Sequence, residues 1–341
     1  MRRRIGILAL IAGLFALPAT AKAAASGEVW TATLSGGAEV PPVATSATGS
    51  ATFVLSPDGT TIRYLVQYSG LSDALAAAHI HLGAAGSNGG VMLPLAAGPS
   101  PMVGILDASD FLATGGVTTF SGALEAIRAG TTYINLHTAA NPAGELRGQL
   151  AIATGAQGFS TPLSGTQEVP PVAGAATGDA TVVINAAGDA ITYWLTDSAM
   201  TSAPAAGHIH LGAAGSNGGI LFPLAGVGTS PVVGTLTAAN LTPTGGVTTF
   251  SGAVDAIRAG TTYINLHTAA NPAGELRGQV GVTVSAPQPT TTPAVTVPPT
   301  STATTDPAAP AVPFLPTLAV LATAAGLGWL LAAAAVLRSR V

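Results

Sequence analysis

The sequence predicts an all-β protein in which two similar domains follow one another. Only 8% of the residues are charged and 5% are aromatic, whereas glycine, alanine, threonine and valine are abundant. This composition suits short strands joined by tight turns better than long solvent-facing helices. In addition, long segments of the first half recur in the second half. There is no cysteine, which excludes disulfides, thiol catalysis and cysteine-based metal sites.

The internal repeat divides the folded part into two units. Three segments occur twice: AIRAGTTYINLHTAANPAGELRGQ at 126–149 and 256–279, HIHLGAAGSNGG at 79–90 and 208–219, and LSG-x-x-EVPPV from Leu34 and from Leu163. We therefore place one domain at 28–152 and the other at 158–284. The period is too long for a solenoid repeat, and each unit is large enough to bury its own core.

Within each unit the strand signals are short and frequent. In the first unit they fall at 29–34, 51–55, 61–68, 78–82, 91–95, 103–106, 132–138 and 145–152. Turn sequences such as Ser-Pro-Asp-Gly at 56–59 and Asn-Pro-Ala-Gly at 141–144 separate them. One short helix is expected at 123–129, ended by Gly130. About eight strands per unit predict a Greek-key sandwich or barrel.

The N-terminus has the features of a secretory signal peptide, which we place at residues 1–23. Arginines at 2–4 precede the apolar run IGILALIAGLFAL, and small residues at 19–23 offer a cleavage site. A retained N-terminal anchor is the alternative, but the apolar run is too short to span a bilayer core of about 30 Å.

The C-terminal region predicts a membrane anchor on a stalk. Residues 285–313 form a Thr/Pro/Ala-rich stalk without hydrophobic periodicity. Residues 314–337 are apolar and uncharged, and the tail at 338–341 is basic. This pattern predicts a transmembrane helix with a cytoplasmic C-terminus, or alternatively a sorting segment that is removed after export. We therefore expect an exported, extracytoplasmic protein anchored to the cell membrane.

The distribution of charge argues against nucleic-acid binding. Six of the eleven basic residues lie at the two ends: Arg2, Arg3, Arg4, Lys22, Arg338 and Arg340. All fifteen acidic residues lie between them, against only five basic ones. A strongly acidic exported part offers no basic patch for a phosphate backbone.

All six histidines fall in the repeated segments, three in each unit: His79, His81 and His137, and His208, His210 and His267. Alternate residues of a strand share one face, so the two histidines of each His-x-His sequence point the same way. A neighbouring strand carrying the third histidine would complete a set that suits zinc or copper. Glu145 and Glu275 are candidates for a fourth ligand.

A structural role for these histidines is the alternative. They would then be partly buried groups that hydrogen-bond to Asn135, Glu145 or backbone carbonyls. Other signals are weaker: the glycine-rich segment at 83–90 lacks the Lys-Ser/Thr of a P-loop, and there is no hydrolase elbow. Glu39 and Arg147 are expected to form an ion pair, as are Glu168 and Arg277.

The three repeated segments closely resemble the CHRD (chordin) domain, and both units match along nearly their whole length. The resemblance implies an immunoglobulin-like β-barrel with a loose similarity to copper and zinc superoxide dismutase, and it implies no established activity. The His-Ile-His sequence is similar to the copper-ligand strand of that dismutase. However, the chain lacks the additional histidines and the cysteines of the enzyme, so dismutase activity is not expected.

Two functional hypotheses follow. The first is a non-enzymatic surface protein whose two domains bind an extracellular protein or an envelope component. The second is a metal-binding or metal-dependent redox protein that uses three histidines in each domain, with copper or zinc as the metal. Metal stoichiometry distinguishes them.

Overall fold

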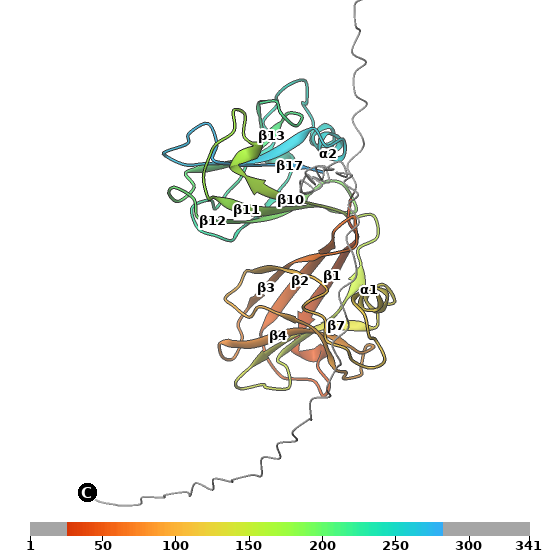
Figure 1. The fold of residues 1–341 in the computed structure, drawn as a ribbon. Coiled ribbons are helices and arrows are strands. Elements are labelled where there is room, and N and C mark those ends of the chain that lie inside the picture. The colour runs from red at the N-terminus through yellow and green to blue at the C-terminus, as the bar shows by residue number, and fades with distance from the viewer. Residues whose placement is uncertain (1–25, 282–341) are drawn as a thin grey trace, which may run out of the picture. The chain divides into compact units, whose positions relative to one another are not determined.

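The computed structural model describes residues 26–281 (Figure 1). The predicted signal peptide, stalk, C-terminal apolar segment and basic tail lie outside these residues. Among the described residues, no helix is long and apolar enough to span a membrane.

The first repeat folds into one sheet with a single α-helix. Its elements are β1 (Val29–Ser35), the 3-10 helix η1 (Gly36–Ala38), β2 (Thr48–Leu55), β3 (Ile62–Ser69), β4 (Leu75–Leu82), β5 (Val91–Leu95), β6 (Met102–Leu106), α1 (Phe120–Arg128), β7 (Thr132–Thr138), β8 (Leu146–Gln149) and β9 (Ala151–Ile152). The strand order is β5-β4-β7-β8-β1-β2-β3-β6, with β9 paired to β1.

The second repeat folds in the same way. Its elements are β10 (Gln157–Ser164), η2 (Gly165–Gln167), β11 (Thr177–Ile184), β12 (Ile191–Ser198), β13 (Ala206–Leu211), β14 (Ile220–Pro223), β15 (Val232–Leu236), η3 (Ala238–Asn240), α2 (Phe250–Arg258), β16 (Thr262–His267) and β17 (Leu276–Val280). The order β14-β13-β16-β17-β10-β11-β12-β15 matches the first sheet. The prediction of two tandem all-β units is confirmed.

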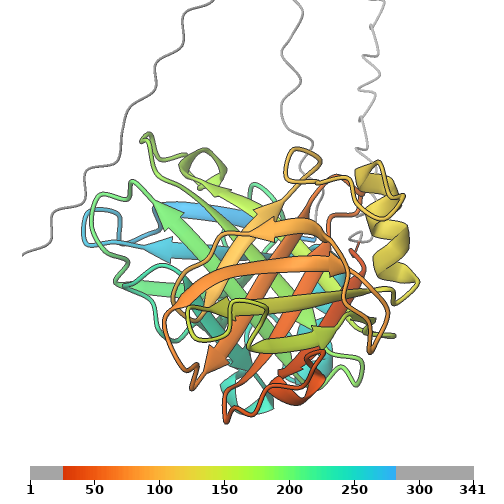
Figure 2. The same ribbon diagram turned by 90° about the horizontal axis from the view of Figure 1, so that it is seen from below.

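Each sheet is antiparallel throughout and curves into a nearly closed barrel or sandwich. The terminal strands β5 and β6 of the first sheet approach each other. Figure 2, seen from below, shows α1, in yellow, at the side of the first sheet. The strand predicted at 145–152 is in fact two: β8 pairs with β7 and, at Arg147, with Ser35 of β1, whereas β9 pairs with Trp30 and Thr31 of β1.

The core follows the period-two alternation of the strands. In β1 the side chains of Trp30, Ala32 and Leu34 are buried, while the intervening threonines are exposed. The apolar face of α1, with Ala123 and Ile127, packs against the same cluster. Successive residues point to opposite faces, so this pattern leaves the other face of β1 free for polar residues.

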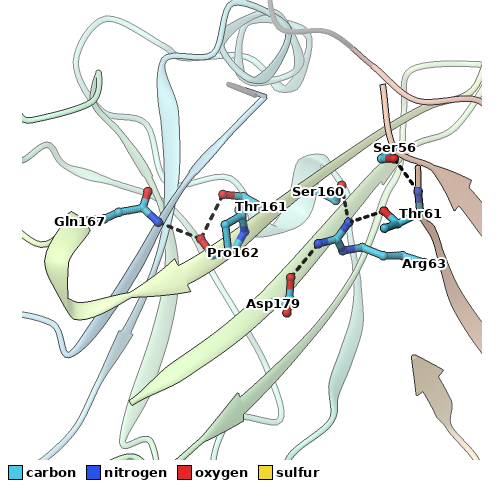
Figure 3. A network of polar contacts seen from close by, with 8 residues as sticks. All are labelled: Ser56, Thr61, Arg63, Ser160, Thr161, Pro162, Gln167 and Asp179. Atoms are coloured by element: carbon cyan, nitrogen blue, oxygen red, sulfur yellow. Dashed lines mark hydrogen bonds and ion pairs between the residues drawn. The ribbon is translucent and has the colours of Figure 1, made fainter. Parts of the chain in front are cut away.

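Further contacts join the first sheet to the second (Figure 3). Arg63 of β3 donates hydrogen bonds to Asp179 of β11 at 2.7 Å and to Ser160 of β10 at 3.2 Å. The Gly27 amide donates to the Gly158 carbonyl at 2.7 Å. A small apolar cluster lies nearby and draws its residues from both sheets: Val29, Val54, Leu65, Val183 and Trp194.

Trp30 allows a direct test of this core. Its side chain is fully buried and its indole N–H has no partner, and Phe159 stands at the equivalent position of the second repeat. We expect Trp30→Ala to lower the free energy of unfolding by about 3–5 kcal/mol, since it leaves a cavity. Trp30→Phe should cost less than about 1.5 kcal/mol. Urea unfolding of both variants checks this, and equal costs would contradict the proposed packing.

Candidate metal centre in each domain

Three histidines of the first domain lie on one face of the strand pair β4–β7. His79 and His81 alternate along β4, and His137 lies near the end of β7. In the register, His79 is opposite Asn135, and His137 is opposite Ala77. The topology therefore brings together residues that are more than fifty positions apart in the sequence.

The three imidazoles converge. One ring nitrogen of each lies within 4.8 Å of the others, and the His79 Nδ1 to His137 Nε2 distance is 3.2 Å. The ring centroids are separated by 5.4 Å for His79 and His81, 5.0 Å for His79 and His137, and 5.8 Å for His81 and His137. Zinc binds imidazole at about 2.0–2.1 Å, so two ligand nitrogens of one ion are at most about 4.2 Å apart. Small side-chain rotations would bring the three ligand nitrogens within about 4.2 Å of one another.

Backbone carbonyls set the tautomers of two of these histidines. His81 Nδ1 donates to the Gly89 carbonyl at 3.0 Å, and His137 Nδ1 donates to the Pro142 carbonyl at 3.2 Å. A carbonyl only accepts, so both Nδ1 atoms carry the proton and both Nε2 atoms present a lone pair. His137 Nε2 accepts from His79 Nδ1, whereas the buried Nε2 of His81 has no partner.

The second domain repeats this geometry. His208 Nδ1 lies 3.0 Å from His267 Nε2, and the buried Nε2 of His210 again lacks a partner. His210 Nδ1 donates to the Gly218 carbonyl at 3.0 Å, and His267 Nδ1 donates to the Pro272 carbonyl at 3.1 Å. The arrangement is thus the same in both domains, which share the segments that carry the histidines.

The imidazoles are neutral at physiological pH. Burial, followed by the proximity of His137 and His81, lowers the pKa of His79 to about 4. Burial also lowers the pKa values of His81 and His137. Neutral imidazole is the form that binds metal, because its lone pair is free.

A buried arginine supports the histidine face. The guanidinium of Arg147 lies 3.5 Å from the centre of the Tyr133 ring, and that ring stacks on His81 with an angle of 9° between the planes. Arg147 also donates to the carbonyls of Ala84 and Ser87, at 3.1 and 2.8 Å, and to the Asn88 side chain. It therefore holds the loop that carries Gly89, whose carbonyl orients His81.

The structure does not bring Glu145 into the histidine cluster. Its carboxylate accepts hydrogen bonds from Ser72, Thr138 and Thr45, with the shortest at 2.6 Å from Ser72 Oγ. Burial alone would raise its pKa, but these hydrogen bonds together lower it to about 2. Glu275 is bound in the same way by Thr201 and Thr268. Both carboxylates tie a loop to a strand instead of facing the imidazoles.

The expected ion pair between Glu39 and Arg147 is also wrong. The ion pairs of the described residues are Arg63–Asp179, Arg128–Glu28 and Arg258–Asp255. Arg147 points its nitrogens to the loop, and the Glu39 carboxyl instead accepts a hydrogen bond from Asn135. The pairing of Glu168 with Arg277 fails for the same reason.

Comparison with protein families accounts for the repeated architecture. A family profile for the CHRD domain matches residues 30–150 and 159–280. The chain belongs to the CHRD domain family. The resemblance noted from the sequence is therefore confirmed, with two copies in tandem. No curated protein matches the chain.

Each CHRD domain uses its repeated segments to build the histidine face. HIHLGAAGSNGG supplies two histidines and the loop over them, and YINLH supplies Tyr133 and the third histidine. The roles of Tyr133 and Arg147 were missed from the sequence. Tyr133 lies two positions before Asn135 on β7, and Arg147 is opposite Asn135 on β8. The alternation of side chains along these strands was the one signal available in the sequence.

Acid should weaken a CHRD domain through its histidines. Their folded-state pKa values lie below the unfolded value near 6.5, so the unfolded chain binds more protons between pH 6.5 and about 4. The stability they contribute is present above pH 6.5 and is lost as pH falls through this window. In urea unfolding, His79→Ala with His208→Ala should reduce the pH dependence, and an unchanged slope would contradict the pKa shifts.

We expect Arg147 to stabilise the folded domain through the hydrogen bonds that its guanidinium donates to the loop, and not through its charge alone. Arg147→Lys keeps the charge but cannot reproduce the loop contacts, so we expect a loss of about 2–3 kcal/mol in the free energy of unfolding. Faster hydrogen exchange should appear in the 83–90 loop. The matched control Arg128→Lys alters an exposed ion pair and should cost less than about 1 kcal/mol. Equal costs for the two variants would argue against the clamp.

Proposed function

We propose that this chain is a non-enzymatic extracytoplasmic surface protein in which each CHRD domain binds one zinc or copper ion through three histidines. The observation that carries this proposal is the buried Nε2 of His81, and of His210, which has no hydrogen-bond partner yet lies in a cluster of imidazole nitrogens. A buried polar atom without a partner is costly, and a metal ion would compensate it.

The ligand chemistry selects the class of metal. Three neutral imidazoles suit zinc, copper or nickel, whereas magnesium and calcium require oxygen ligands. The carbonyls of Gly89 and Pro142 bind the far nitrogens of His81 and His137, which is the usual outer-shell support of metal-binding histidines. The fourteen acidic residues among 26–281, against five arginines, favour a cation electrostatically.

The location of the metal modules belongs to the same proposal. CHRD domains are extracellular-type domains, and the N- and C-terminal segments have the sequence features of a signal peptide and a membrane anchor. We infer that the two domains, with an immunoglobulin-like or dismutase-like Greek-key topology, stand on the stalk outside the membrane. The partly exposed His79 and His137 make the cluster accessible to an extracellular protein or an envelope component.

Metal stoichiometry tests the proposal. The full-length, tag-free chain is incubated with zinc or copper, desalted and submitted to elemental analysis. We expect about two equivalents per chain, because each domain holds one cluster. His81→Ala with His137→Ala should leave one equivalent, and adding His210→Ala with His267→Ala should leave none.

The control for this experiment changes a residue far from the histidines. Glu125→Gln removes a charge on α1 and should leave both equivalents in place. If no ion is retained, or if retention is the same in the histidine variants, the metal proposal is wrong. The histidines would then serve only to hold the strand ends together.

A further inference from the structure

A buried carboxyl group lies beside the histidine face but outside the cluster. Glu39 follows η1 in the repeated EVPPV segment and is only 5% exposed. Its Oε2 accepts a hydrogen bond from Asn135 Nδ2 at 3.4 Å, and its Oε1 is buried without a partner. The Oδ1 of Asn135 is also buried without a partner. Glu39 and Asn135 are thus joined by one hydrogen bond, and each has a second, buried oxygen that lacks a hydrogen-bond donor.

The close approach of the chain at Gly144 limits the distance between these two oxygens. A Cβ atom at Gly144 would lie 2.4 Å from Asn135 Oδ1, 2.6 Å from Asn135 Nδ2 and 2.7 Å from Glu39 Oε1. The two orphaned oxygens are therefore at most 5.1 Å apart, since both distances start from the same point. The glycine, with φ of 132°, leaves room for both groups.

The second domain has the same arrangement. Asn265 Nδ2 donates to Glu168 Oε2 at 3.2 Å, and Glu168 Oε1 and Asn265 Oδ1 are both buried without partners. At Gly274 the corresponding distances are 2.4, 2.6 and 2.6 Å. The two domains of this chain, which share the EVPPV and YINLHTAANPAGEL segments, thus have the same pair of unpartnered oxygens.

One proton would satisfy both orphans. If the carboxyl is neutral, Oε1–H can donate to Asn135 Oδ1 while Oε2 accepts from Asn135 Nδ2, which forms a ring of two hydrogen bonds between an acid and an amide. An ionised carboxylate would leave two acceptors facing each other in a buried place, which is unfavourable.

The surrounding charged groups leave this carboxyl weakly compensated. From β8, Arg147 is the nearest cation, but its nitrogens donate to the loop. From β4, His79 lies opposite Asn135 in the register and is neutral. After Gly144, Glu145 turns its carboxylate toward Ser72. Burial raises the pKa of Glu39 to about 7, even though Arg147 and the Asn135 hydrogen bond act in the opposite direction.

We propose that Glu39 and Glu168 are neutral acids that close an acid–amide ring with Asn135 and Asn265, and that their ionisation is a pH-sensitive latch. The ring holds the EVPPV segment on β7. This segment lines a groove of about 390 Å³ together with Arg147, Gln149 and Gly86. Ionisation sets the carboxylate against the amide oxygen and weakens this attachment, so the groove loosens as pH rises through neutrality.

The latch and the histidines change the stability of the protein in opposite directions as pH rises, which distinguishes their contributions. The folded state keeps a proton on Glu39 that the unfolded chain releases above about pH 4.5. The latch therefore stabilises the protein most in mild acid, and its contribution falls as pH rises toward 7. A shift from 4.5 to about 7 corresponds to a change of up to about 300-fold in the unfolding equilibrium constant.

Glutamine tests this directly because its amide imitates the neutral acid at every pH. In the full-length chain, Glu39→Gln with Glu168→Gln should raise the melting temperature at pH 8 by several degrees. At pH 5 the variant and the parent should melt together. The control Glu125→Gln removes an exposed charge and should give no such pH-dependent difference.

An opposite result would overturn the latch. If the glutamine variant is less stable than the parent at pH 8, the carboxylate is needed there as the counter-ion of Arg147. A difference that is the same at pH 5 and pH 8 would also refute it. Infrared spectroscopy adds a direct measurement: the carbonyl stretch of a protonated carboxyl should be present in the parent at pH 6 and reduced in the glutamine variant.

Discussion

A buried guanidinium lies beneath the polar face of each CHRD domain, and most of that face is arranged around it. Arg147 is 2% exposed and contacts the Tyr133 ring, while its nitrogens hold the carbonyls of the 83–90 loop. Tyr133 in turn stacks on His81, and its hydroxyl accepts from the Gly89 amide. Without this cation, the loop, the aromatic ring and the histidine tautomer would each lose a fixed partner.

The consequence is a polar face whose remaining titratable groups are kept neutral. Burial lowers the pKa of His79 to about 4 and raises that of Glu39 to about 7, so both groups resist the charged form. Glu145 is the exception, because Ser72, Thr138 and Thr45 supply the hydrogen bonds that a carboxylate needs. The two glutamates share one kind of side chain, and their hydrogen-bond partners decide their charge.

Several features of this face were predictable and others were not. The spacing of His79 and His81 placed them on one side of a strand, and the repeat predicted that whatever they do occurs twice. The fourth-ligand role expected of Glu145 and the pairing of Glu39 with Arg147 were wrong. Both errors have one cause: loops carry the hydroxyls and carbonyls that these charged groups use, and sequence periodicity says nothing about where a loop folds back.

The sequence by itself determined the all-β class, the two tandem domains and the family, because alternation, turn residues and repeated segments are local properties of the chain. It also determined that three histidines per domain lie on strands. Only the tertiary structure decided that β4 and β7 are neighbours, which brings His137 beside His79. Strand order and the burial of a charge depend on contacts between residues far apart in the chain, so they arise only when the sheet closes around its core.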